Sequence, residues 1–240
     1  MPASIFDLFS IGVGPSSSHT LGPMRAARHF AFRLREAGVL DACERVAGDL
    51  YGSLALTGRG HCTDKAVLAG LSGRCAEEIG PGELTEIEAN VRKEGSLPLA
   101  GSRRCPFAIE RDLAFRTDEL LPAHSNGMRF RAFDAAGRTL AESIYYSVGG
   151  GFVVDGDGTP IDEDAGVKPA SYPYLSGEAL LSAARDRGIR IADLVWEWER
   201  GLRGEQETQA RLLRIAAVMD GCIHAGLHAE GNLPGGLGVR

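Results

Sequence analysis

The chain has 240 residues and a net charge of −6, and its 44% hydrophobic and 24% charged residues are typical of a globular protein of one or two domains. It has no basic tail or stripe, so neither nucleic acid nor an anionic membrane is an expected partner. No apolar run approaches the ~18 residues of a membrane-spanning helix, and no basic residue precedes Arg25 as in a signal peptide. We therefore expect a soluble, cytoplasmic protein.

The first part of the chain predicts a turn, a helix and a strand. Residues 12–23 are rich in Gly, Ser and Pro and are expected to lie outside regular structure. A helix is predicted from Pro23 to Gly38, because apolar residues recur at helical spacing and glycine often follows the last turn. Residues 45–56 carry apolar side chains at alternate positions, which predicts a strand.

Two further helices and a hairpin follow. Thr63 is expected to cap a helix that reaches Leu71, and residues 83–94 carry apolar side chains on one helical face. Residues 128–133 and 139–154 predict a hairpin, with Ile144, Tyr146 and Val148 marking its second strand. This order of elements indicates an α+β domain over residues 1–160.

The last third predicts a linker and three helices. Residues 155–175 are rich in Asp, Gly and Pro, which indicates a linker, and residues 176–187, 191–203 and 206–228 have helical periodicity. The last helix carries an apolar face that is expected to be a core stripe, formed by Leu212, Ile215, Ala216, Met219 and Ile223. A calcium loop starting at Asp155 is disfavoured, because Pro160 and Gly166 replace its required Gly and Glu.

The cysteine spacing predicts no metal site within this chain. No two of the five cysteines form a C-x-x-C pair, and their spacing fits neither a zinc nor an iron–sulfur site; they are Cys43, Cys62, Cys75, Cys105 and Cys222. With no secretory signal, a disulfide framework is not expected either.

Three histidines lie in polar turns: His19, His61 and His124. Neutral imidazole is the side chain best suited to proton transfer near pH 7. His19 and His61 also precede predicted helices, where main-chain N–H groups favour a carboxylate or phosphate. The residues alone leave two interpretations open, a site for a small acid and a pair of helix-capping turns.

Three other chemistries are disfavoured. Residues 14–18 do not form the G-x-S-x-G turn of serine hydrolases, and no acidic residue can be assigned to orient a histidine. A phosphate-binding loop would need Gly-Lys-Ser/Thr, which the chain lacks. A pyridoxal-type lyase needs a lysine Schiff base, and Lys65 is the only lysine near a candidate site.

Five motifs together resemble bacterial iron–sulfur-dependent L-serine dehydratases (L-serine ammonia-lyases). They occur in that family's order and span the chain; they are residues 12–24 (GVGPSSSHTLGPM), 51–61 (YGSLALTGRGH), 124–128 (HSNGM), 145–152 (YYSVGGGF) and 233–237 (LPGGL). One position departs from the family pattern, because Cys62 stands where many members have a second histidine.

The resemblance implies a two-domain enzyme. Residues 1–160 would form a β domain similar to the allosteric substrate-binding domain of phosphoglycerate dehydrogenase, 161–175 a linker, and 176–240 the helical start of an α domain. That α domain holds a [4Fe–4S] cluster in the family, so the cluster ligands would lie outside this chain. The missing α domain or α subunit is an expected partner, as is a second copy in a homodimer.

The resemblance also implies the chemistry. L-serine would lose its Cα proton and its hydroxyl to give pyruvate and ammonia, with His61 as the base and His19 and His124 assisting. The substrate carboxylate and ammonium would be held by Ser16, Ser17, Ser18, Thr20, Thr63 and Asn126. We expect the chain to be inactive alone, and the alternative is a non-catalytic module that binds serine or a related small acid.

Overall fold

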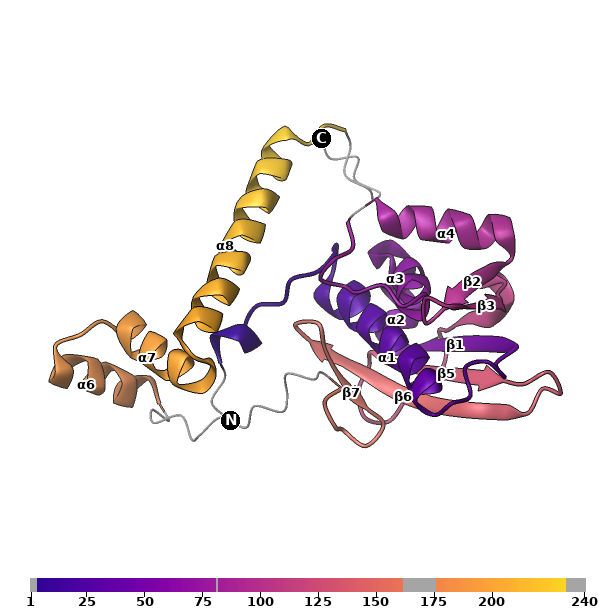
Figure 1. The fold of residues 1–240 in the computed structure, drawn as a ribbon, viewed down its shortest axis with the longest axis horizontal. Coiled ribbons are helices and arrows are strands. Elements are labelled where there is room, and N and C mark those ends of the chain that lie inside the picture. Colours follow the sequence, from indigo (N-terminus) through magenta and orange to yellow (C-terminus); the bar gives the residue numbers. More distant parts are fainter. Residues whose placement is uncertain (1–3, 81, 162–175, 232–240) are drawn as a thin grey trace. The chain divides into compact units, whose positions relative to one another are not determined.

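The computed structural model describes residues 4–80, 82–161 and 176–231 (Figure 1). The chain divides into two compact units, Gly12–Glu163 and Met1–Ile11 with Asp164–Arg240. The first eleven residues therefore group with the helices at the other end of the chain, whereas the sequence placed them in the domain of residues 1–160. The expected linker and the terminal motif at 233–237 lie largely or wholly outside the described residues.

The larger unit is built on a five-stranded mixed sheet, which confirms the α+β class. Its strands, in spatial order, are β4 (Leu113–Arg116), β1 (Arg45–Tyr51), β5 (Gly127–Phe133), β6 (Thr139–Gly149) and β7 (Phe152–Asp155). β1 pairs in parallel with β4 and antiparallel with β5, and the other pairs are antiparallel. β2 (Ser96–Leu99) and β3 (Arg103–Pro106) form a separate two-stranded ribbon.

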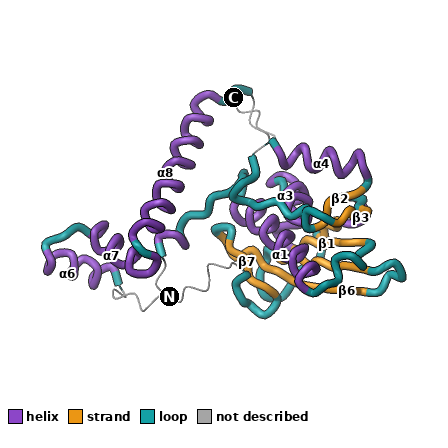
Figure 2. Tube along the Cα trace, viewed as in Figure 1, coloured by secondary structure: helices purple, strands orange, loops and turns teal. Residues whose placement is uncertain are grey.

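The helices of this unit cover one face of the sheet (Figures 1 and 2). The bounds are Gly22–Glu36 for α1, Gly52–Thr57 for α2, Thr63–Leu71 for α3, Glu83–Glu94 for α4 and Ile109–Asp112 for α5. Phe30 and Leu34 of α1 pack with Leu50 and Phe130 of the strands in one hydrophobic core. The spacing of apolar residues thus predicted α1, α3, α4 and the hairpin of β5 and β6 correctly.

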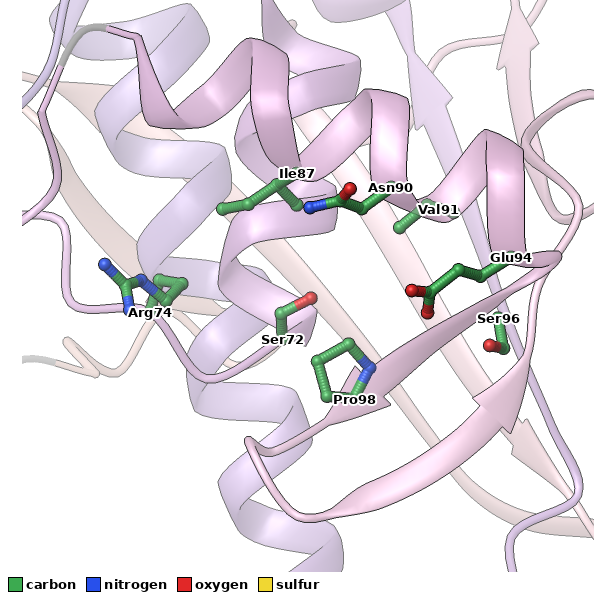
Figure 3. A pocket seen from close by; sticks show the side chains of 8 residues that line it. All are labelled: Ser72, Arg74, Ile87, Asn90, Val91, Glu94, Ser96 and Pro98. Atoms are coloured by element: carbon green, nitrogen blue, oxygen red, sulfur yellow. The ribbon is translucent and has the colours of Figure 1, made fainter.

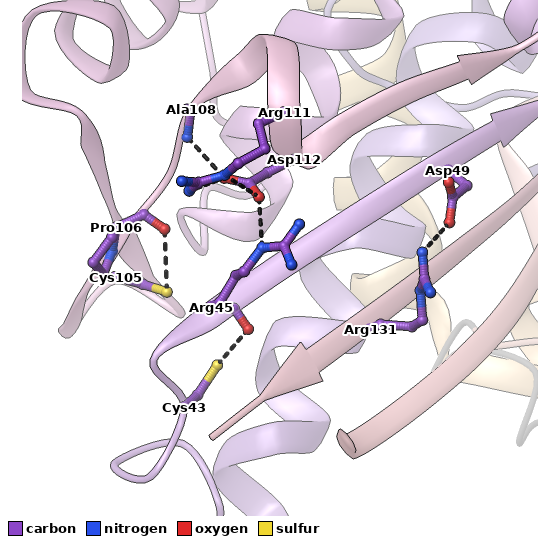
Figure 4. A network of polar contacts seen from close by, with 9 residues as sticks. All are labelled: Cys43, Arg45, Asp49, Cys105, Pro106, Ala108, Arg111, Asp112 and Arg131. Atoms are coloured by element: carbon purple, nitrogen blue, oxygen red, sulfur yellow. Dashed lines mark hydrogen bonds and ion pairs between the residues drawn. The ribbon is translucent and has the colours of Figure 1, made fainter. Parts of the chain in front are cut away.

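The other face of the sheet carries a charged cluster on β1, β4 and β5. The carboxylate of Asp49 is 2% exposed and accepts from the guanidinium groups of Arg116, Arg129 and Arg131 at 2.9, 3.2 and 2.7 Å. Burial by itself would raise the pKa of Asp49, but the three arginines together hold it below its usual value. Figure 4 shows Asp49 and Arg131 side by side on this face.

Several local predictions are wrong. The strand predicted over 45–56 ends at Tyr51, and α2 follows, so that Leu56 is 67% exposed instead of facing the core. Residues 17–21 form a π-helical turn within a segment expected to be irregular. The strand predicted over 139–154 is divided after Gly149 into β6 and β7, which pair with each other in antiparallel orientation.

The smaller unit contains α6 (Gly177–Arg187), α7 (Ile191–Arg203) and α8 (Glu205–His228), close to the predicted ranges. The N-terminal segment joins it through Ser4, whose hydroxyl donates to the buried carboxylate of Glu199 at 2.8 Å. The apolar face of α8 is not a core stripe among the described residues, because Met219 and Ile223 are exposed. No helix in the described residues is long and apolar enough to cross a membrane.

Candidate active site

His19 lies on the π-helical turn Ser17–Leu21, which runs directly into α1. Ser16 begins the turn, and its hydroxyl accepts from the main-chain N–H of His19 at 3.2 Å. The N–H of Ser16 in turn donates to the hydroxyl of Thr20 at 3.2 Å. Such π-helical turns often occur at functional sites, and here the turn presents the imidazole of His19 toward α2.

His61 ends the 3-10 turn Gly58–His61, just before α3. Its Nδ1 lies 3.0 Å from the carbonyl oxygen of Thr57. A carbonyl can only accept, so Nδ1 carries the hydrogen in the neutral ring and Nε2 keeps its lone pair. Within the described residues no group hydrogen-bonds to this Nε2, which leaves it able to accept a proton.

The rings of His19 and His61 face each other, with centroids 5.0 Å apart and planes inclined at 45°. Both nitrogens of His19 are engaged, Nδ1 with the hydroxyl of Ser18 at 2.8 Å and Nε2 with that of Ser53 at 2.9 Å. Burial lowers the pKa of His19, and the neighbouring His61 lowers it further. Both effects favour the neutral form of the His19 imidazole.

Hydrogen bonds from two threonines connect the two turns that carry His19 and His61. The hydroxyl of Thr20 donates to the carbonyl oxygen of His61 at 2.7 Å. The hydroxyl of Thr63 donates in the opposite direction, to the carbonyl oxygen of His19. Thr63 does not cap α3, because the residue before the helix is Cys62 and no side chain caps this end. Both threonines are fully buried, and their bonds fix the spacing of the two histidines.

Cys62 connects His61 to Thr63 in a left-handed backbone conformation, with φ at 56°. A non-glycine residue in this region stores local strain, which persists only where the surrounding structure imposes it. Here the imposing contacts are the threonine hydrogen bonds on either side. The departure from the family pattern therefore falls on a strained position between two residues of the candidate site.

The turn that carries His124 is joined to the same region. Its Nδ1 accepts from the main-chain N–H of Asn126 at 3.0 Å, so a neutral His124 carries its hydrogen on Nε2. The buried side chain of Asn126 donates to the carbonyl of Ser147 on β6 at 3.1 Å. The N–H of Ser53 donates to the carbonyl of Ser125 at 2.9 Å, which ties this turn to the start of α2.

The structure brings most of the predicted site residues together, but not all. Ser16, Ser18, Thr20 and Thr63 surround His19 and His61 through the hydrogen bonds above. Ser17 is exposed, and no hydrogen bond of its hydroxyl occurs among the described residues. Across the same residues, the ring of His124 makes no ring contact with the other two. Its role, like the substrate roles of the polar side chains, remains a prediction.

Ser53 is a site residue that the sequence did not single out. It sits in the motif 51–61, directly after Gly52, and its hydroxyl reaches His19. Gly52 has φ at +52° and lies so close to Ser125 that a Cβ would stand 2.4 Å from its carbonyl oxygen, so the backbone before Ser53 requires glycine. The sequence carried no separate signal for Ser53 beyond its place in the motif 51–61.

No group of three His, Cys, Asp or Glu side chains in the described part of the chain could hold a metal ion. Cys43 and Cys105 are buried, with thiols directed at the carbonyls of Arg45 and Pro106 (Figure 4), and Cys222 is exposed. The described cysteines thus do not fit an iron–sulfur cluster. The ammonium of Lys65 bonds to Thr85 at 3.1 Å and pairs with Glu88 on α4, rather than with either histidine.

Comparison with known proteins gives consistent matches. The family model described as "Serine dehydratase beta chain" matches residues 4–158. All of the chain aligns with an L-serine dehydratase of Streptomyces coelicolor at 46% identity, covering 53% of that protein, and with one of Mycobacterium bovis at 42%, covering 52%. L-serine dehydratase TdcG of Escherichia coli is 40% identical over 98% of the chain and 52% of its own length. The chain spans about half the length of these relatives.

Proposed function

Because this chain belongs to the serine dehydratase beta chain family, we propose that it supplies the histidine-bearing part of an L-serine ammonia-lyase. The reaction converts L-serine to pyruvate and ammonia by α,β-elimination. The observation that carries this proposal is the facing pair of His19 and His61, held 5.0 Å apart by hydrogen bonds between their own turns. The family relatives named L-serine dehydratase support the choice of substrate.

His61 is the proposed base. Its Nε2 has a free lone pair in the neutral ring, because Nδ1–H donates to the carbonyl of Thr57. It takes the Cα proton of serine, the Cα–H electron pair forms the Cα=Cβ bond, and the Cβ–O bond breaks with its electron pair on oxygen. The leaving hydroxide takes a proton from the protonated His61 and departs as water, which returns His61 to its neutral form. The aminoacrylate that results tautomerises to an imine, and water hydrolyses it to pyruvate and ammonia.

His19 and His124 are proposed to assist. The neutral form of His19 is favoured by burial, and its ring is bonded to the hydroxyls of Ser18 and Ser53, which can relay a proton. The neutral ring of His124 has its N–H on Nε2 and can donate to the substrate carboxylate. Ser16, Ser17, Ser18, Thr20, Thr63 and Asn126 complete the proposed substrate shell, in which Thr20 and Thr63 act chiefly by positioning the two histidines.

The rest of the proposal concerns the complete enzyme. A [4Fe–4S] cluster belongs to it by family resemblance, with ligands outside this chain, because the described residues do not fit such a group. No step above is therefore assigned to the cluster. The proposed partners are an α domain or α subunit and a second copy in a homodimer, in the cytoplasm. The proposal also includes a likeness of the fold to the allosteric substrate-binding domain of phosphoglycerate dehydrogenase.

The test is an assay of pyruvate and ammonia release from L-serine. We expect activity from the complete enzyme, prepared anaerobically with its cluster, and none from these 240 residues alone. A complete enzyme that releases no pyruvate would contradict the proposal. If it nevertheless bound serine by calorimetry, the alternative of a non-catalytic binding module for serine or a related small acid would take its place.

A further inference from the structure

Three consecutive glycines connect β6 to β7, and all three have positive φ angles, 107° at Gly149, 61° at Gly150 and 83° at Gly151. Glycine adopts such a backbone readily, but it also loses more conformational freedom on folding than any other residue. This glycine turn therefore keeps one shape only where other groups hold it. It lies in the motif 145–152, whose glycines have no part in the proposed reaction.

The glycine turn packs against the turn that carries His19. Leu21 is the last residue of that π-helical turn and is 3% exposed. A Cβ at Gly151 would stand 2.5 Å from Cδ2 of Leu21, and a Cβ at Gly12 would stand 2.5 Å from its Cδ1. Leu21 therefore fits between two glycines whose missing side chains make room for it. The position of the glycine turn thus limits where Leu21, and with it the His19 turn, can lie.

Arg25, one helical turn after Leu21, bonds to the glycine turn. Its Nη1 donates to the carbonyl oxygen of Gly151 at 3.0 Å, and its Nε donates to Oε1 of Glu77 at 3.1 Å. The other carboxylate oxygen of Glu77 accepts from the thiol of Cys75 at 2.9 Å. Burial opposes ionisation of Glu77, but Cys75 and Arg25 together hold its pKa below the usual value. One guanidinium thus links α1, the segment after α3 and the glycine turn.

We propose that Arg25 is a positioning residue for His19 and acts through the glycine turn. The His19 turn needs support from outside, because π-helical hydrogen bonding is rare and occurs mostly in single turns. The threonine hydrogen bonds described above fix one side of the turn, and the contact of Leu21 with Gly151 fixes its end. The effect on turnover rests on the proposed function, whereas the position of His19 can be measured without turnover.

NMR titration of the His19 imidazole in this chain tests the proposal. Arg25→Met keeps the aliphatic stem and removes the donors, and Glu77→Ala removes the carboxylate that orients them. Either change should loosen the His19 turn and admit water, which raises the pKa of His19 because burial is the main cause of its lowered value. Charge alone would act with opposite signs, since loss of a cation raises the pKa of a histidine and loss of an anion lowers it. A rise in both variants therefore reports position and not charge.

Two further comparisons sharpen this test. Arg25→Lys keeps the charge but cannot reproduce the fork of donors, so it should raise the pKa of His19 by a smaller amount, and it decides the question if Arg25→Met does not fold. The ion pair of Glu94 with Arg104 is the matched control, in which Glu94 ends α4 and lines the cavity shown in Figure 3. Glu94→Ala and Arg104→Met make the same changes of charge and should leave the titration of His19 unchanged.

Turnover separates this proposal from the proposed function. In the complete enzyme, Arg25→Met should lower kcat for pyruvate release at least tenfold, and Arg25→Lys should recover part of that loss. Opposite changes in the pKa of His19 in Arg25→Met and Glu77→Ala, or no change in either or in Arg25→Lys, would overturn the positioning role. If the pKa rises in both variants while the unsubstituted enzyme releases no pyruvate, the positioning role stands and the proposed function fails.

Discussion

The hydroxyl of Thr20 lies 2.7 Å from the carbonyl oxygen of His61 and donates to it. Thr63 makes the reciprocal bond to the carbonyl of His19, so each histidine is held by a threonine from the other histidine's turn. The main-chain carbonyls of both histidines are thus fixed, while Nε2 of His61 makes no hydrogen bond with another described residue. These two reciprocal hydrogen bonds explain how turns from different parts of the chain hold His19 and His61 in a fixed relative position.

Substitution of the proposed base should reduce turnover most. In the complete enzyme, His61→Ala is expected to lower kcat by roughly 10²–10⁴-fold, the usual contribution of a general base. The measurement is pyruvate release from L-serine at saturating substrate. His224→Ala, on the exposed part of α8, serves as the control and should retain normal turnover. A His61→Ala enzyme with near-normal kcat would remove this residue from the base role.

The hydrogen bonds of Thr20 and Thr63 should be energetically coupled, so that their contributions to the free energy of unfolding are not additive. Thr20→Val leaves a buried carbonyl and the N–H of Ser16 without a partner, which should cost about 1–3 kcal/mol in urea unfolding. Thr63→Val should cost a similar amount, and a double-mutant cycle should show a coupling of about 0.5–3 kcal/mol. Thr20→Ser keeps the hydroxyl and should restore most of the stability. Strictly additive losses would mean that the two bonds do not act together.

The pKa of His19 should respond to its neighbour. Burial is the main cause of its lowered pKa and His61 the second, so His61→Gln should raise the pKa of His19 without restoring its usual value. NMR titration of the imidazole resonances measures this directly. Because the pKa is lower in the folded state, the unfolded state binds the proton more readily. Stability from this group is therefore present above the unfolded pKa of 6.5 and falls as the pH drops below it. An unchanged titration in His61→Gln would contradict the pairing.

The carboxylate of Asp49 should contribute stability that disappears in acid. Its pKa is lowered in the folded state, so the contribution is present above the unfolded value of 3.8 and is lost as the pH falls through the folded pKa. Asp49→Asn should cost about 2 kcal/mol at pH 7, less than a fully buried ion pair because the arginines are partly in solvent. Unfolding curves of variant and parent should converge toward pH 2. Asp157→Asn, at an exposed turn, should show no such difference.

Gly52 should not accept a side chain. Gly52→Ala combines a φ of +52° with a Cβ placed 2.4 Å from the carbonyl oxygen of Ser125, so we expect a loss of about 2–3 kcal/mol. The hydrogen bond between Ser53 and His19 should be disturbed as well, which a shift of the His19 imidazole resonances would report. Gly60→Ala is the matched control, since nothing lies within 4 Å of its Cβ position. Equal stability of the two variants would show that the close approach at Gly52 is unimportant.

The sequence alone was sufficient to predict those helices and strands whose hydrophobic pattern lies within one short segment. The helix α1, the helix α4 and the hairpin of β5 and β6 follow from spacing and turn residues within each segment. It was not sufficient for β4, for the β2–β3 ribbon or for the end of β1 at Tyr51. The parallel pairing of β4 with β1 joins segments far apart in the chain, and β4 has only four residues, too few for a recognisable hydrophobic pattern.

For the site, the residue types and their motifs were visible in the sequence, and they pointed to His19, His61 and His124 because imidazole in a polar turn is suited to proton transfer. Only the tertiary structure shows that the rings of His19 and His61 face each other and that the hydroxyl of Ser53 is hydrogen-bonded to His19. It also shows that the hydroxyl of Thr63 donates to the carbonyl oxygen of His19 instead of capping a helix. The physical reason is that each of these hydrogen bonds joins a side-chain hydroxyl to a group that lies in a different turn, so the partners are set by the packing of α1 and α3 and not by neighbours in the sequence.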